Sequence, residues 1–280
     1  MPGTYRYVIV DVFTDRPLAG NQLAVFTDAR AIPEEHLQPL ARELNLSETV
    51  FVLPKRGDGH VRIRIFTPAG ELPFAGHPVL GTAFVLGAPL QLVEIKLETE
   101  AGLVPVLLER EGARISFGRM SQPLPAWRPY DREAELLTAL GVERSELPVE
   151  AYDLGPGFAL VMLATPERVS ALAPDLAALE RHELGVYCFA RDGERWRTRM
   201  FAPSHGVAED PATGSAAGPL AVHLARHGLV PFGEEIEIDQ GLEIGRPSRL
   251  YARAEGSLER LDRVEVGGSA VIVARGEFRL

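Results

Sequence analysis

The stretch Phe66–Leu86, FTPAGELPFAGHPVLGTAFVL, decides the fold, because a second version of it follows at Phe201–Leu224, FAPSHGVAEDPATGSAAGPLAVHL. Both versions run from a Phe-x-Pro strand end through a glycine turn into a helix of small and apolar residues. The two phenylalanines lie 135 residues apart (201 − 66) and the glycines before the helices 138 (214 − 76), near half of the 280-residue chain. This spacing favours a duplicated domain, with chance similarity of glycine- and alanine-rich segments as the alternative.

Both helices of this repeat are apolar on nearly every face. They span His77–Leu86 and Ser215–Arg226, and charged side chains are almost absent from them. A helix that is apolar all round is expected to be buried. Pro219 lies about one turn into the second helix, where its missing N–H costs least. Each half of the chain is therefore predicted to hold one buried helix.

Runs of β-branched and aromatic residues predict strands in both halves. The predicted strands are Tyr7–Phe13, Gln22–Phe26, Thr49–Leu53, Val61–Phe66, Leu92–Glu98, Val104–Glu109, Arg114–Phe117, Glu235–Asp239, Ser248–Arg253 and Val271–Ala274. An amphipathic helix is predicted around Leu37–Leu44, either starting late or kinked at Pro39, with Asn45 as its stop. The segment Val207–Gly214 is predicted to be a loop.

The bulk composition fits a soluble two-domain protein. Hydrophobic residues make up 46% and charged residues 24%, and the net charge of −10 argues against binding nucleic acid or an anionic membrane surface. No apolar run approaches the ~18–20 residues of a membrane span, and the N-terminus lacks a signal peptide's apolar segment. The single cysteine, Cys188, excludes an intramolecular disulfide and fits a reducing cytoplasm, so a cytoplasmic location is expected.

The starts of the two apolar helices are candidate anion sites. A helix that begins with Gly76-His77 or Gly214-Ser215 presents unpaired backbone N–H groups and the positive end of its dipole. Glycine at both positions lets a ligand approach the backbone closely. Two such starts, one per half, could together hold a carboxylate. The alternative is that both glycines only form turns.

Glu48 is the candidate proton-transfer residue. It lies in the segment Asn45–Val52, NLSETVFV, where a carboxylate comes immediately before an apolar strand. Nearby apolar side chains would raise the pKa of such a carboxyl and suit it to general acid/base chemistry. The alternative is a solvated turn residue, which most glutamates are.

Other motifs are weak, and they predict neither a metal nor a cofactor. His223 and His227 share a helix face at i, i+4, but the sequence offers no HExxH glutamate and no convincing third ligand. The serine of Gly214–Gly218 is one position away from a GxSxG nucleophile. No dinucleotide-binding glycine loop or phosphate-binding P-loop is present.

Four segments together resemble one known family. They are Asp11–Phe26 (DVFTDRPLAGNQLAVF), Ala41–Val52 (ARELNLSETVFV), Phe66–Gly81 (FTPAGELPFAGHPVLG) and Phe201–Gly218 (FAPSHGVAEDPATGSAAG). The chain resembles the phenazine-biosynthesis PhzF-like isomerases over essentially its whole length. The resemblance implies an α+β fold similar to diaminopimelate epimerase, with two pseudo-symmetric domains that each wrap a curved, barrel-like mixed sheet around a central helix. The expected domains are 1–117, to which 267–280 can return, and 118–266, with the active site between them.

The resemblance also implies a cofactor-free isomerase that acts on a small cyclic or amino carboxylic acid similar to a dihydro-hydroxyanthranilate. Glu48 would move the proton, and His77, Asp210 and Ser215 would line the same pocket. Asp210 would hold an amino or hydroxyl group, and the amides of Gly76, His77, Gly214 and Ser215 would grip the carboxylate.

Two-thiol racemisation, as in the epimerases, is excluded because the matching segments carry no cysteine. We expect a homodimer. The alternative function is a non-catalytic small-carboxylate-binding protein on the same fold, but a pure binder has no need of a carboxylate in an apolar site.

Overall fold

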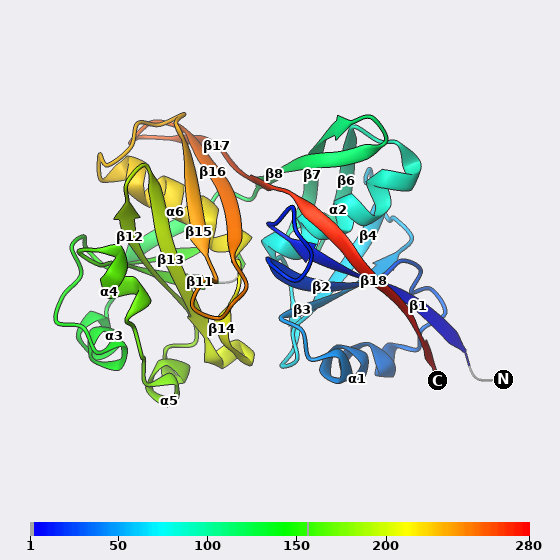
Figure 1. Ribbon diagram of the computed structural model, residues 1–280, viewed down its shortest axis with the longest axis horizontal. Helices are drawn as coiled ribbons and strands as arrows, with labels where there is room; N and C mark the ends of the chain where they lie inside the picture. Colours follow the sequence, from blue (N-terminus) through cyan, green and yellow to red (C-terminus); the bar gives the residue numbers. More distant parts are fainter. Residues whose placement is uncertain (1–2, 156) are drawn as a thin grey trace. The chain divides into compact units, whose positions relative to one another are not determined.

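The computed structural model describes residues 3–155 and 157–280, and the chain divides into two compact units. Unit 1 contains the residues up to Ser121 together with Gly267–Leu280, and unit 2 contains Gln122–Val266 (Figure 1). The chain leaves unit 1 near the end of β8 (Arg114–Gln122) and returns to it near the end of β17 (Leu261–Gly268).

Unit 1 is a mixed sheet with two helices. Its other strands are β1 (Thr4–Val12), β2 (Asn21–Phe26), β3 (Glu48–Leu53), β4 (Val61–Phe66), β5 (Glu71–Leu72), β6 (Glu94–Thr99), β7 (Gly102–Glu111) and β18 (Ala270–Arg279), and its helices are α1 (Glu34–Leu44) and α2 (Gly76–Leu90). β1 lies antiparallel between β18 and β2. The sheet then continues with β2 parallel to β3, β3 antiparallel to β4, β4 parallel to β6 and β6 antiparallel to β7.

Unit 2 repeats this arrangement. Its strands are β9 (Ala126–Pro129), β10 (Glu150–Asp153), β11 (Gly157–Met162), β12 (Gly185–Asp192), β13 (Arg195–Ala202), β14 (Val207–Asp210), β15 (Glu235–Gln240), β16 (Ser248–Gly256) and β17, and its helices are α3 (Glu133–Leu140), α4 (Pro166–Ser170), α5 (Leu176–Leu179) and α6 (Gly214–Arg226), with 3₁₀ turns η1 (Glu180–His182) and η2 (Pro203–His205). Here β11 is parallel to β12, β12 antiparallel to β13, β13 parallel to β15 and β15 antiparallel to β16.

The two units therefore share one order of strand pairings, and α2 and α6 follow equivalent strands, β4 and β13. Chance similarity does not reproduce four successive pairings with the same directions, so the duplication is confirmed. The mixed sheets also confirm the predicted α+β class and exclude a doubly wound parallel sheet.

The central helices are buried as their composition predicts. The structure buries 11 of the 15 residues of α2 and 12 of the 13 residues of α6. Gly81 shows how closely α2 approaches its sheet: a Cβ there would lie 2.7 Å from both Leu23 Cδ2 and Val12 Cγ2. A larger residue at this position would force helix and sheet apart. Close packing of α2 fixes the position of its N-terminus, where the candidate site begins.

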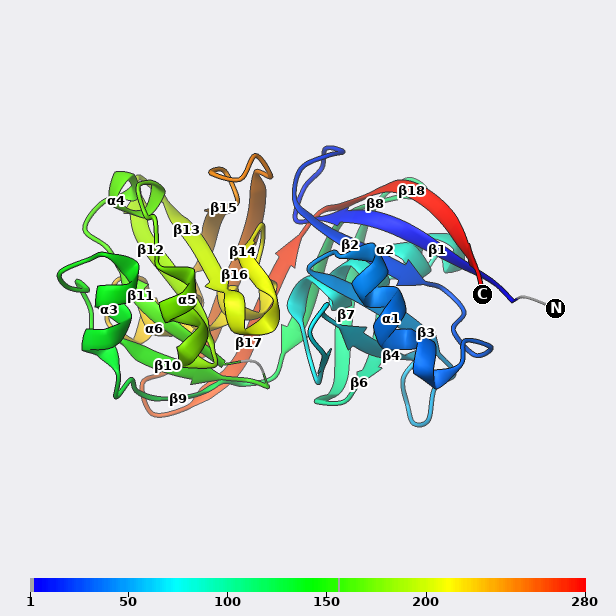
Figure 2. The same cartoon turned by 90° about the horizontal axis from the view of Figure 1, so that it is seen from below.

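The remaining helices cover the other faces of the sheets. In unit 1, α1 contacts β3 and β4, and its apolar face packs on Phe26 and Phe51 (Figure 2). In unit 2, α4 contacts β12 and β13, and α3 and α5 pack on each other (Figure 2). No helix among the described residues is long and apolar enough to cross a membrane.

Several local predictions need correction. Helix α1 begins at Glu34, so Pro39 lies inside it and does not delay its start; its predicted stop at Asn45 is confirmed by a left-handed φ of 50°. The segment Val207–Gly214 is not all loop, because β14 forms from its first four residues by pairing with β13. The irregular alternation of Val207–Asp210 gives no strand signal on its own.

Candidate active site

Glu48 and His77 lie side by side in unit 1. β3 begins at Glu48, which pairs with Leu23 on β2, and His77 is the second residue of α2. The distance from Glu48 Oε2 to His77 Nε2 is 3.4 Å, and the exposed fractions of the two side chains are 13% and 3%. The structure thus brings together the predicted proton-transfer carboxylate and the predicted histidine, in a largely water-excluded setting.

His77 is neutral at physiological pH. Burial lowers the pKa of its imidazole to about 3, against the opposing effect of a backbone hydrogen bond to Gln22. The amide nitrogen of Asn21 lies 3.2 Å from His77 Nδ1. His77 Nε2 faces Glu48 Oε2, so an uncharged imidazole lies against the carboxylate.

The N-terminus of α2 presents two backbone amides beside this pair. No side chain caps the helix, and the N–H of Val79 donates to the carbonyl of Ala75. Residue 78 is proline, which has no N–H. The amides of Gly76 and His77 therefore precede the first intrahelical bond and are oriented to receive an anion.

Unit 2 carries an equivalent helix start. Asp210 ends β14, Ser215 is the second residue of α6, and each is 5% exposed. The Thr213 hydroxyl donates to Asp210 Oδ2 at 2.6 Å. The amides of Ala216 and Ala217 donate to the Thr213 carbonyl, so those of Gly214 and Ser215 precede the intrahelical bonds. The structure therefore places the predicted residues Asp210, Gly214 and Ser215 close together, between the end of β14 and the first turn of α6.

The sequence analysis assigned no role to three residues that contact His77 or Asp210. Asn21 contacts His77, and Thr213 and Gln240 contact Asp210. Asn21 and Thr213 lie inside segments that carry the family resemblance, and this position in the sequence could have marked them as candidate site residues. Gln240 lies on a strand outside all four segments, and nothing in the sequence connects it to Asp210.

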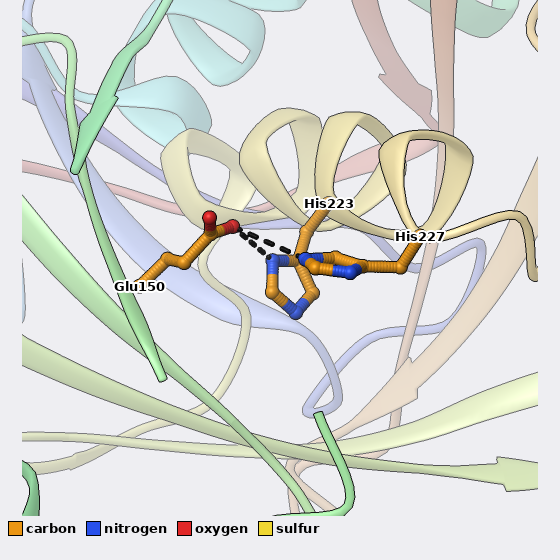
Figure 3. A group of neighbouring side chains, drawn as sticks. All are labelled: Glu150, His223 and His227. Atoms are coloured by element: carbon orange, nitrogen blue, oxygen red, sulfur yellow. Dashed lines mark hydrogen bonds and ion pairs between the residues drawn. The ribbon is translucent and has the colours of Figure 1, made fainter. Parts of the chain in front are cut away.

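A second polar cluster lies at the other end of α6. Figure 3 shows Glu150 of β10 directed at His223 and His227. Glu150 Oε2 is 3.1 Å from His223 Nδ1 and 3.3 Å from His227 Nε2. The three groups could hold a metal ion. The sequence argument that the histidine pair lacks a third ligand was therefore wrong, because Glu150 precedes the pair by more than seventy residues and only the fold brings it near.

We interpret this cluster as an ion-pair network, because Arg226 already neutralises the carboxylate. Its Nη1 lies 2.6 Å from Glu150 Oε2, and its guanidinium stacks 4.3 Å from the ring centroid of Trp127. Burial alone would raise the pKa of Glu150, but hydrogen bonds from His223 and Arg226 outweigh it and hold the pKa well below its usual range. A fixed guanidinium against the same oxygen opposes a divalent cation.

Replacing Arg226 with methionine is expected to lower the free energy of unfolding by roughly 3–5 kcal/mol, because a buried carboxylate loses its cation. The same variant should gain Co²⁺ binding, since the repulsive charge is gone. Urea unfolding and the visible absorption of Co²⁺ measure the two effects. The matched control is Arg279→Met, which breaks an exposed pair with Glu277 and should cost about 0–1 kcal/mol. Tetrahedral Co²⁺ bands in the wild-type protein would overturn this interpretation.

Comparison with known proteins gives the class to which this fold and site belong. The family model described as phenazine biosynthesis-like protein (PhzC-PhzF) matches residues 10–276. The chain is 53% identical to trans-2,3-dihydro-3-hydroxyanthranilate isomerase of Pseudomonas aeruginosa, over 99% of this chain and 100% of that protein. It is 52% identical to the isomerase of the same name from Pseudomonas fluorescens, with the same coverage. The chain belongs to the PhzF family and is an isomerase.

Solved structures agree with this assignment. The phenazine biosynthesis protein of the PhzF family from Bacillus anthracis matches with a TM-score of 0.84 at 25% identity, covering 99% of both chains. A hydroxyproline epimerase from Agrobacterium vitis matches with a TM-score of 0.71 at 14% identity, over 99% of this chain and 91% of the other, which shows a shared fold. The predicted epimerase-like architecture is confirmed, and the non-catalytic binding protein is not supported.

Proposed function

We propose that this protein isomerises trans-2,3-dihydro-3-hydroxyanthranilate. The observation that carries the proposal is the 53% identity, end to end, with the Pseudomonas aeruginosa enzyme named for that substrate. Such identity over the whole chain, together with the buried Glu48–His77 pair, favours the same reaction over a different one on the same fold. The fold by itself would not, because one fold serves many reactions.

In this proposal Glu48 is the general acid/base. A C–H bond breaks at one substrate carbon as its proton moves to Glu48, and the double bond shifts. Glu48 then returns the proton to a second carbon on the same face, so no atom is gained or lost. The buried setting supports this role, because a carboxylate shielded from water exchanges its proton slowly with solvent. Neutral His77 orients the carboxylate and does not compete for the proton.

The helix N-termini hold the substrate. The amides of Gly76 and His77 in unit 1, and of Gly214 and Ser215 in unit 2, bind the substrate carboxylate. Asp210 accepts a hydrogen bond from the substrate amino or hydroxyl group. The reaction needs neither a metal nor an organic cofactor, because proton transfer and charge stabilisation come from the chain.

The test is to incubate the purified protein with trans-2,3-dihydro-3-hydroxyanthranilate and follow the reaction by proton NMR and mass spectrometry. We expect a product of unchanged mass with a shifted double bond. In D₂O the product should carry less than one full equivalent of deuterium, because Glu48 returns part of the original hydrogen. An unchanged substrate at high enzyme concentration would contradict the proposal. Full deuterium incorporation would contradict the single-base shuttle alone.

We also propose that the enzyme is a cytoplasmic homodimer. The absence of a candidate spanning helix among the described residues and the lone buried thiol support a reducing, aqueous location. Light scattering on the eluting protein should give twice the 30.5 kDa chain mass. A mass of one chain at micromolar concentration would contradict the dimer.

A further inference from the structure

The buried side-chain amide of Gln240 forms several hydrogen bonds beside the proposed substrate site. It ends β15 and its side chain is 0% exposed. Its Oε1 accepts from the Thr213 N–H at 3.2 Å, the Tyr187 hydroxyl at 3.1 Å and the Thr198 hydroxyl at 3.4 Å. Its Nε2 donates to the Asp210 carbonyl at 2.8 Å and to Thr213 Oγ1 at 3.0 Å. One side chain thus ties β12, β13 and β15 to the turn before α6.

Two backbone partners fix the orientation of this amide. The Thr213 N–H can only donate, so the atom facing it is the amide oxygen. The Asp210 carbonyl can only accept, so the atom facing it is the amide nitrogen. Burial also raises the pKa of Tyr187, which keeps its hydroxyl protonated as a further donor to Oε1. The amide therefore cannot flip without breaking several buried bonds.

The amide orientation sets the direction of the next hydrogen bond. Because Nε2 donates to Thr213 Oγ1, that oxygen acts as an acceptor towards Gln240. The threonine's own proton is then directed at Asp210 Oδ2, 2.6 Å away, a distance typical of a hydroxyl bonded to a carboxylate. The side chains form a relay of two hydrogen bonds: Gln240 donates to Thr213, and Thr213 donates to the Asp210 carboxylate.

We propose that Gln240 is a positioning residue for the isomerase, acting through Thr213 to hold Asp210 as an oriented hydrogen-bond acceptor. The same contacts fix the first turn of α6, where the amides of Gly214 and Ser215 lie. Gln240 itself need not touch the substrate. The inference rests on the proposed role of Asp210 in holding the substrate amino or hydroxyl group.

Steady-state kinetics on trans-2,3-dihydro-3-hydroxyanthranilate test the catalytic consequence. Thr213→Val removes the hydroxyl at nearly constant shape and should lower kcat/KM by about tenfold or more, mainly through KM. Thr213→Ser keeps the hydroxyl and should stay within about threefold of wild type. Gln240→Met should resemble Thr213→Val. The matched control is Thr198→Val, which removes a buried hydroxyl that touches Gln240 Oε1 but not Asp210, and should leave KM unchanged.

Hydrogen exchange of the Thr213 hydroxyl tests the relay without any turnover. The isotope shift on its Cβ carbon in mixed H₂O and D₂O reports the exchange rate by NMR. We expect slow exchange in the wild type and in Thr198→Val. Exchange should be at least about tenfold faster in Gln240→Met, because the hydrogen bond from Gln240 Nε2 to Thr213 Oγ1, which directs the hydroxyl proton towards Asp210, is lost.

Three outcomes are distinguishable. A folded Gln240→Met with unchanged hydroxyl exchange and unchanged KM overturns the positioning role. Equal KM increases in Thr198→Val and Thr213→Val also overturn it, because general loosening of the core then explains both. A wild-type protein that leaves the substrate unchanged contradicts the proposed function, and the exchange measurement still decides whether the relay exists.

Discussion

Glu48→Gln is expected to lower the turnover of trans-2,3-dihydro-3-hydroxyanthranilate by about 10²–10⁴-fold while substrate binding is largely kept. Glutamine preserves the size of the side chain and its contact with His77 but cannot take up a proton. General acid/base groups typically contribute factors of this size, roughly 3–5 kcal/mol of barrier. Steady-state kinetics give the loss in kcat, and calorimetric titration at 10 °C with the inactive variant gives the affinity.

The matched control for this prediction is Glu43→Gln, an exposed glutamate at the end of α1, five residues earlier in the chain. It should keep wild-type kinetics. His77→Asn should differ from Glu48→Gln by weakening binding as well as rate, because we assign His77 to orienting groups and not to moving the proton. Wild-type turnover by Glu48→Gln would show that this carboxylate is not the base, even though the family assignment stands.

Acid is expected to destabilise the folded protein through His77. Its pKa falls from an ordinary 6.5 to about 3 because the ring is buried. Below pH 6.5 the unfolded chain binds a proton at this residue and the folded chain does not. The contribution to stability is therefore complete above pH 6.5 and is lost as the pH falls towards 3. The loss is about 3 kcal/mol at pH 4.5 and about 4 kcal/mol at pH 3.

Urea unfolding at pH 7.5 and pH 4.5 measures this effect. His77→Gln removes the titrating group, so its free energy of unfolding should fall by about 3 kcal/mol less than that of the wild type between the two pH values. The other histidines contribute to both proteins alike and cancel in the comparison. His60→Gln, at an exposed site, should follow the wild type. Equal losses for wild type and His77→Gln would mean that His77 is charged in the fold or reached by water.

Much of the architecture could be predicted from the sequence because its causes are local or periodic. The repeat at about half the chain length reveals the duplication, and helices without a polar face, such as Ser215–Arg226, must be buried wherever they are packed. Asn45 ends α1 because an asparagine tolerates the left-handed conformation that a helix end needs. The candidate proton-transfer residue Glu48 and the candidate anion sites at the starts of α2 and α6 could also be predicted, because each depends on only a few neighbouring residues.

What the tertiary structure decided depends on residues distant in sequence. Asn21 contacts His77 across 56 positions, and Gln240 reaches Asp210 across 30. Glu150 joins His223 across 73 positions, and Arg226 beside it turns a metal-like set of ligands into an ion-pair network. Sequence spacing cannot give these contacts, because strand pairing and helix packing bring the groups together. Burial, which sets the charge of His77, likewise exists only once the chain is folded.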